Sequence, residues 1–159
     1  MALIKNGILE QNTWQHVGDD ESLPQSAMTV SLKRWKAEKE DLLARNLPLG
    51  LRLNSEDAPE EMADEVKHFS LIVLEFTHFT DGRAFSQARL LRERFNFTGE
   101  LRVRGNYLRD QVFFLSRVGV NAFELPDTNA VEDLLAALHE FSVKYQAAVD
   151  IPKPLYRHR

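Results

Sequence analysis

Leu71-Ile72-Val73-Leu74-Glu75-Phe76, with the Thr77-His78-Phe79-Thr80-Asp81-Gly82-Arg83 that follows, defines the fold better than any other stretch of this sequence. The apolar run from Leu71 to Leu74 is typical of a strand that is buried on both faces. The polar residues after Phe76 lead into a helical pattern that begins at Arg83. A buried strand that passes through a polar loop into a helix predicts one βα unit of a parallel sheet.

The same unit repeats along the chain. The spacing predicts four strand–helix pairs, at 49–53 and 54–67, 70–76 and 83–95, 101–104 and 108–118, and 122–125 and 130–148. We therefore expect an α/β fold with a mainly parallel sheet. Two architectures are consistent with four units. One is a small open sheet with helices on both faces, which is the more common form at this length, and the other resembles half of a (β/α)8 barrel.

The N-terminal part precedes these repeats. Residues 1–17 are expected to form a β-hairpin, because Asn6-Gly7 is a typical type I′ turn between two short apolar segments. A helix is expected from 31 to 46, where the apolar residues recur at helical spacing. We expect residues 1–150 to form a single domain, with the βα repeats at 49–148 and a flexible tail at 151–159.

Composition excludes several classes of protein. The 159 residues carry a net charge of −4 and contain no cysteine, which excludes disulfides, thiol nucleophiles and cysteine-bound metal clusters. The histidines show no metal-ligand spacing either. No apolar run is long enough for a transmembrane helix, and we expect a cytoplasmic protein without a membrane partner. The acidic chain lacks a lysine-rich stripe, so we expect no nucleic-acid partner.

A candidate site follows from the predicted topology. The carboxyl ends of parallel strands share one edge of the sheet, and ligands of α/β proteins bind there. The residues expected to bind a ligand at this edge are Thr80, Asp81, Gly82, Arg83, Arg104, Asn106 and Arg109. His78 lies in the same loop and is the candidate for proton transfer near neutral pH.

Arginine is concentrated around this edge. From Arg83 to Arg117 the chain has eight arginines, no lysine and three acids. These arginines either lie on solvated helix faces or face an anion, for which the planar guanidinium is well suited. Arg102 and Arg104 alternate along one predicted strand and therefore share a face. They either pair with carboxylates such as Glu75 and Glu124 or contact a ligand.

Two segments carry a family resemblance. Residues 79–94 and 99–112 resemble a bacterial family of unknown function, whose members are often described as probable oxidoreductases of sulfite reduction and are encoded beside an assimilatory sulfite reductase haemoprotein. The resemblance implies an accessory protein that binds this reductase or a small oxyanion. The alternative that it implies is an oxidoreductase with a dissociable flavin or nicotinamide cofactor. Catalysis itself stays open, and a half-barrel or an exposed sheet edge would favour a homodimer.

Overall fold

A computed structural model describes residues 2–78, 82–125 and 130–144, with side chains as far as residue 139. The strands are β1 (Ala2–Lys5), β2 (Ile8–Glu10), β3 (Gln15–His16), β4 (Met28–Ser31), β5 (Leu49–Leu53), β6 (Leu71–Phe76), β7 (Glu100–Gly105) and β8 (Ala122–Leu125). The helices are α1 (Leu32–Ala44), the 3-10 helix η1 (Pro59–His68), α2 (Arg83–Arg89), the π-helix η2 (Leu90–Arg94), α3 (Arg109–Arg117) and α4 (Val131–Lys144).

All eight strands belong to one sheet, in the order β2-β1-β8-β7-β6-β5-β4-β3. Strands β3 to β8 run parallel to one another, whereas β1 is antiparallel to both β8 and β2. Each parallel strand from β4 to β8 is added beside the previous one in the same direction. Right-handed crossovers then place every connecting helix on the same face of the sheet.

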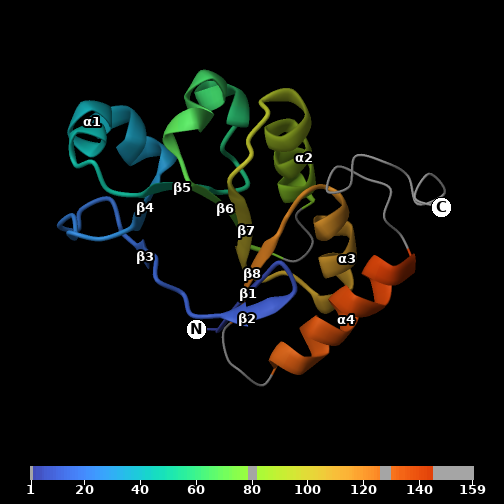
Figure 1. Ribbon diagram of the computed structural model, residues 1–159. Helices are drawn as coiled ribbons and strands as arrows, with labels where there is room; N and C mark the ends of the chain where they lie inside the picture. Colours follow the sequence, from blue (N-terminus) through green and yellow to red (C-terminus); the bar gives the residue numbers. More distant parts are fainter. Residues whose placement is uncertain (1, 79–81, 126–129, 145–159) are drawn as a thin grey trace.

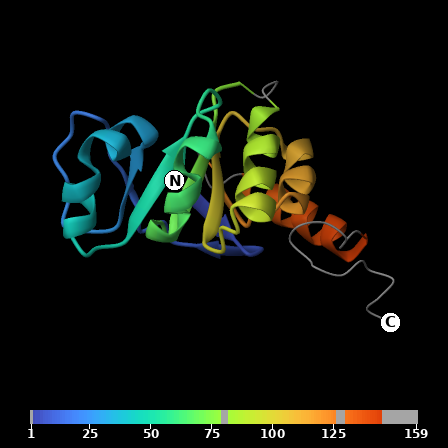
Figure 2. The ribbon, with the colours of Figure 1, turned by 90° about the horizontal axis from the view of Figure 1, so that it is seen from above.

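The sheet curls into an arch, with the helices on its convex side (Figures 1 and 2). The half-barrel is thus confirmed, and the open sheet with helices on both faces is wrong for this chain. The four predicted βα units are all present as far as Lys144. The end of the last predicted helix, at 145–148, and the predicted tail at 151–159 lie outside the described residues. The structure adds a fifth, because Met28–Ser31 forms β4 before α1. Ser31 ends that strand and caps α1, since its hydroxyl accepts a hydrogen bond from the Arg34 N–H at 3.1 Å.

The predicted N-terminal hairpin is present, but it covers only Ala2–Lys5 and Ile8–Glu10 of the expected residues 1–17, because Gln15–His16 pairs with β4 instead. Asn6 and Gly7 have φ of 53° and 78°, as a type I′ turn requires, and Lys5 pairs with Ile8 across them. Residues 11–14 then connect β2 at one edge of the sheet to β3 at the other, and we call them the strap. Five peptide steps span at most roughly 17 Å, so the two edges lie close together. The strap runs across the open side of the arch (Figure 1).

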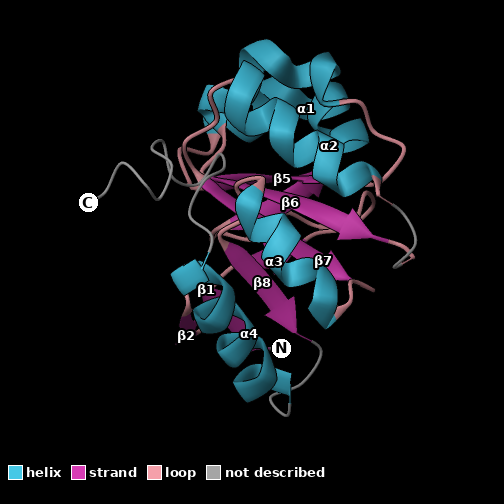
Figure 3. Cartoon of the chain, turned by 90° about the vertical axis from the view of Figure 1, so that its right-hand side faces the viewer, coloured by secondary structure: helices cyan, strands magenta, loops and turns pink. Residues whose placement is uncertain are grey.

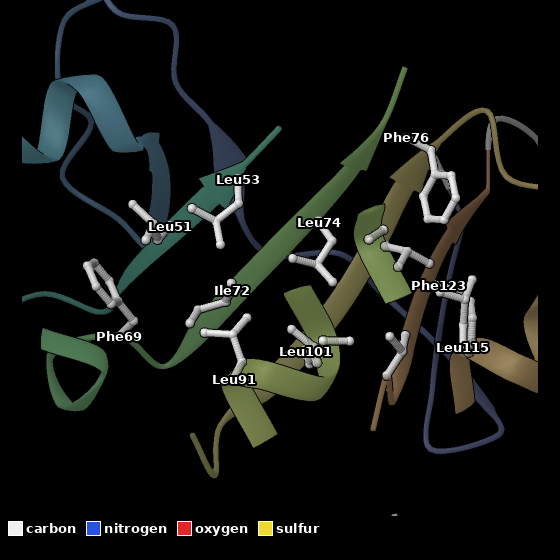
Figure 4. Close-up of a cluster of buried hydrophobic side chains, with 14 of the residues drawn as sticks. Leu51, Leu53, Phe69, Ile72, Leu74, Phe76, Leu91, Leu101, Leu115 and Phe123 are labelled. Carbon is white, nitrogen blue, oxygen red and sulfur yellow. The ribbon is translucent and has the colours of Figure 1, made fainter. Parts of the chain in front are cut away.

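The convex face of the sheet and the helices enclose the apolar core. Alternate residues of the central strands point into it, among them Leu51, Ile72, Leu74 and Leu101, and each is fully buried (Figure 4). Burying one such side chain contributes about 2 kcal/mol. Successive side chains of a strand point to opposite faces of the sheet, so the residues between these apolar ones point to the concave side. The two faces of the sheet therefore differ in composition.

Candidate functional site

The concave face of the arch is charged. Side chains from β1, β3, β5, β6, β7 and β8 meet there through ion pairs and hydrogen bonds, and we call them the inner ionic network. Its members are Lys5, His16, Arg52, Glu75, Glu100, Arg102, Arg104 and Glu124. These residues alternate along their strands with the apolar residues that face the helices. A charged interior is costly unless its groups are paired, so the partners of each residue matter.

The deepest part of the inner ionic network centres on Arg102, which is 1% exposed. Its guanidinium lies 2.6 Å from Glu100 Oε2 and 2.9 Å from Glu124 Oε2. Glu100 also pairs with the Lys5 ammonium at 3.2 Å. The strap adds the side-chain oxygen of Asn12, which accepts from Arg102 at 3.1 Å. These short contacts hold Arg102 in a structural role.

His16 connects the two sides of the arch. One ring nitrogen lies 2.7 Å from Glu124 Oε2 on β8, and the other lies 2.7 Å from the Thr29 hydroxyl on β4. Arg52 contacts the same hydroxyl at 2.9 Å and donates to the carbonyls of Thr29 and Val17. The imidazole thus bridges strands that are separated by three others in the sheet.

The charge of Glu124 is stabilised by its surroundings. Burial alone would raise the pKa of this carboxyl, but hydrogen bonds and positive charge from His16 and Arg102 lower the pKa to about 2. Burial and the negative charge of Glu124 raise the pKa of Tyr107 above its ordinary value. The Tyr107 hydroxyl donates to the backbone carbonyl of Glu124 at 2.6 Å. Glu124 is therefore an ionised carboxylate at neutral pH.

The layer nearest the carboxyl ends of the strands is held more loosely. Glu75 and Arg104 are register partners on β6 and β7, and their side chains are 34% and 26% exposed. Arg104 Nη1 lies 3.5 Å from Glu75 Oε2, and its Nε lies 3.8 Å from Glu124 Oε1. Within the described part of the chain, Glu124 Oε1 is buried and has no hydrogen-bond partner. Arg104 thus combines exposure with long contacts, whereas Arg102 combines burial with short ones.

Arg104 is accordingly the predicted site residue that lies at the open end of the network. Asn106 follows at the end of β7, where its side-chain amide donates to the Thr77 carbonyl at 2.8 Å. Gly105 lies with φ of 101° directly against β6, because a Cβ there would lie 2.3 Å from the Phe76 carbonyl oxygen. These contacts join the ends of β6 and β7, which lie next to each other at this edge of the sheet (Figure 3).

The other predicted residues lie on the helices above this edge. Arg83 is exposed at the start of α2 and donates to the Ser55 carbonyl at 3.3 Å. Arg109 is exposed at the start of α3 and donates to the Asp133 carbonyl of α4 at 3.3 Å. Gly82, which precedes α2, has open space where a Cβ would lie. His78 is exposed, and Thr80 and Asp81 fall outside the described residues.

The interpretation of the sequence did not place four members of the inner ionic network, Lys5, His16, Arg52 and Glu100. A signal for Arg52 was present, because a charge at an alternate position of the apolar strand Leu49–Leu53 indicates a second, polar face. Glu75 and Glu124 were predicted as ion-pair partners of the two β7 arginines, and the structure confirms both. No local pattern indicates His16, because its partners are distant in the chain.

Comparison with known proteins gives one match. The family described as "Bacterial protein of unknown function (DUF934)" matches residues 50–156, and a search of curated proteins found no match. Within the described ranges, no helix is long and apolar enough to cross a membrane.

Proposed function

We propose, for a chain that belongs to this bacterial family of unknown function, a role as an accessory protein of assimilatory sulfite reduction. In this proposal the protein binds a small oxyanion at the carboxyl ends of its strands. The observation that supports oxyanion binding concerns Arg104. Its side chain is partly exposed and makes only long contacts with two carboxylates. The pathway is supported by the resemblance of residues 79–94 and 99–112 to proteins encoded beside a sulfite reductase haemoprotein.

Arg104 can turn toward a ligand at low cost. The 3.5 Å pair with Glu75 is partly exposed and contributes little stability. The 3.8 Å pair reaches the buried Glu124, whose carboxylate still contacts His16 and Arg102 when the guanidinium turns. The planar fork then offers two parallel N–H groups to an oxyanion. Arg102 cannot act in this way, because turning it would break its short contacts with Glu100 and Glu124 deep in the interior.

The charges around Arg104 favour an anion of low charge. Glu75 and Glu124 lie on either side of it, and Arg52, which lies 3.7 Å from Glu75, adds a second nearby cation. Two carboxylates repel a dianion more strongly than a monoanion. Hydrogen sulfite, which carries one charge and one proton, should therefore bind better than sulfate.

Isothermal titration calorimetry with sulfite, sulfate and phosphate tests this proposal. The parent protein is compared with Arg104→Gln and with Arg94→Gln, a matched control that removes one exposed arginine from η2. We expect sulfite binding to be weakened at least tenfold in Arg104→Gln and unchanged in Arg94→Gln. Binding should also be tighter below the second pKa of sulfurous acid than above it. Equal sulfite binding in the parent and Arg104→Gln would refute the site.

The link to the pathway needs a separate measurement. Growth on sulfate as sole sulfur source should slow in a deletion strain and be restored by the parent gene but not by the gene for Arg104→Gln. Normal growth and normal sulfite reduction in the deletion strain would refute the accessory role, whatever the calorimetry shows.

A further inference from the structure

A second surface lies on the outer side of the helices, away from the inner ionic network. Residues 83–94 and 109–117, which form α2, η2 and α3, contain six arginines, no lysine and two acids, in a chain whose net charge is −4. Helices α2 and α3 lie side by side on the convex face (Figure 3). Arg92 joins them, because it donates to the carbonyl of Gly119, just beyond α3, at 2.8 and 3.0 Å.

Aromatic side chains lie among these arginines. Phe114 on α3 is 54% exposed, although phenylalanine is usually among the buried residues. Its ring meets the partly buried Phe113 ring edge-on, with 5.1 Å between centroids. The Arg117 guanidinium lies 5.5 Å from the centroid of Phe113. Arg89 is 59% exposed and pairs with Glu93, one turn later, at 3.5 Å. Arg94 is exposed at the end of η2.

We infer that this surface, formed by Arg89, Arg94, Phe113, Phe114 and Arg117, is a docking site for an acidic segment of another protein that carries apolar side chains. Phenylalanine and arginine are enriched at protein interfaces, where aromatic anchors dominate the binding energy and lysine is depleted. The composition here has that character. A positive surface on a chain of negative net charge also steers an acidic partner toward one face.

A second copy of the chain is a poorer occupant. Its acidic side chains on α1 and η1, such as Glu40, Glu60 and Asp64, lie on different elements from the arginines. Contact between two different faces of identical chains is head-to-tail, so it would produce rings or open filaments. The inference is independent of oxyanion binding, because it uses none of the residues of the inner ionic network.

Three synthetic helical peptides test the docking site on the full chain. The first has glutamates beside a stripe of leucines, the second has lysines in place of the glutamates, and the third has glutamines in place of the leucines. Fluorescence anisotropy should show the first binding at least tenfold more tightly than the other two, with an affinity that falls as salt is added. Amide chemical-shift changes in the labelled protein should cluster on α3 and η2.

Matched variants distinguish specific docking at this surface from non-specific electrostatic binding of the peptide. Phe114→Ser should weaken the acidic peptide about tenfold, as expected for a central aromatic anchor. Arg89→Gln should weaken it and reduce its dependence on salt. Leu43→Ser, which changes a residue that is 38% exposed on α1, should have no effect. Equal binding of the lysine peptide, unchanged binding by Phe114→Ser, or displacement of the peptide by a single-stranded oligonucleotide would overturn the inference.

Discussion

Replacing Glu124 by glutamine should remove most of the stability that charge pairing gives to the interior of the arch. The substitution keeps the shape of the side chain but removes the negative charge that His16 and Arg102 share. The pKa of Glu124 is about 2 in the native protein, against an ordinary value of 4.5. At about 1.4 kcal/mol per pKa unit, this difference corresponds to about 3 kcal/mol in favour of the folded, ionised form.

The same difference sets the dependence on pH. Because the native pKa is depressed, the stabilisation is complete above pH 4.5 and is lost as the pH falls from 4.5 toward 2. Urea unfolding at a series of pH values, followed through the buried Trp35, measures it. Near neutral pH the free energy of unfolding of the parent should exceed that of Glu124→Gln by about 3 kcal/mol. This difference should become smaller as the pH is lowered.

A control removes a carboxylate elsewhere. Glu40→Gln, at an exposed position of α1, should change the free energy of unfolding by less than about 0.5 kcal/mol at every pH. The predicted role of Glu124 is refuted if the difference in free energy of unfolding between the parent and Glu124→Gln stays constant from neutral pH into the acid range. It is also refuted if this difference near neutral pH is below about 1 kcal/mol, since the pairing would then not offset the desolvation of the charge.

Three further changes test how the arch is held together. Gly50→Ala places a Cβ 2.8 Å from a threonine methyl on the neighbouring strand and should cost about 1–3 kcal/mol in thermal unfolding, whereas Gly82→Ala, where the space is open, should be nearly neutral. Arg92→Met removes hydrogen bonds to three backbone carbonyls and should cost about 3 kcal/mol in urea unfolding, unlike Arg94→Met at an exposed site. Tyr107→Phe should cost about 1 kcal/mol and should remove the tyrosine that titrates last in an ultraviolet pH titration.

The repeating part of the fold is readable from the sequence because its signals are local. The apolar run Leu71–Leu74 and the turn glycines Gly82, Gly99 and Gly119 mark these units without reference to the rest of the chain. Met28–Ser31 was not predicted as a strand, because two of its four residues are polar. The fold explains them: Thr29 contacts Arg52 on the concave side, and Ser31 caps α1. Curvature was not predictable, because it depends on how the edges are joined by the strap.

The candidate site was predicted in part for the same reason. Strand alternation placed Arg102 and Arg104 on one face and indicated Glu75 and Glu124 as their partners. Alternation alone did not distinguish the two arginines. One is buried and the other partly exposed because their depths in the arch differ, and depth depends on the register of β7 against its neighbours. His16 joins the site through residues that are 13 and 108 positions away.

The pairing of β1 with β8 has a consequence for biosynthesis and folding rate. Ala2 pairs with Leu125, so β1, which pairs early with β2, meets its second partner β8 only after most of the described chain has been made. Strands β4 to β8 can assemble in order of synthesis, each against its predecessor. Contacts of such large sequence separation slow folding, because the entropy of closing the loop is lost before the contact is gained. The apolar Leu3 and Ile4 therefore stay exposed longest during synthesis, and a nascent chain that is stalled before residue 122 should bind hydrophobic chaperones through its N-terminus.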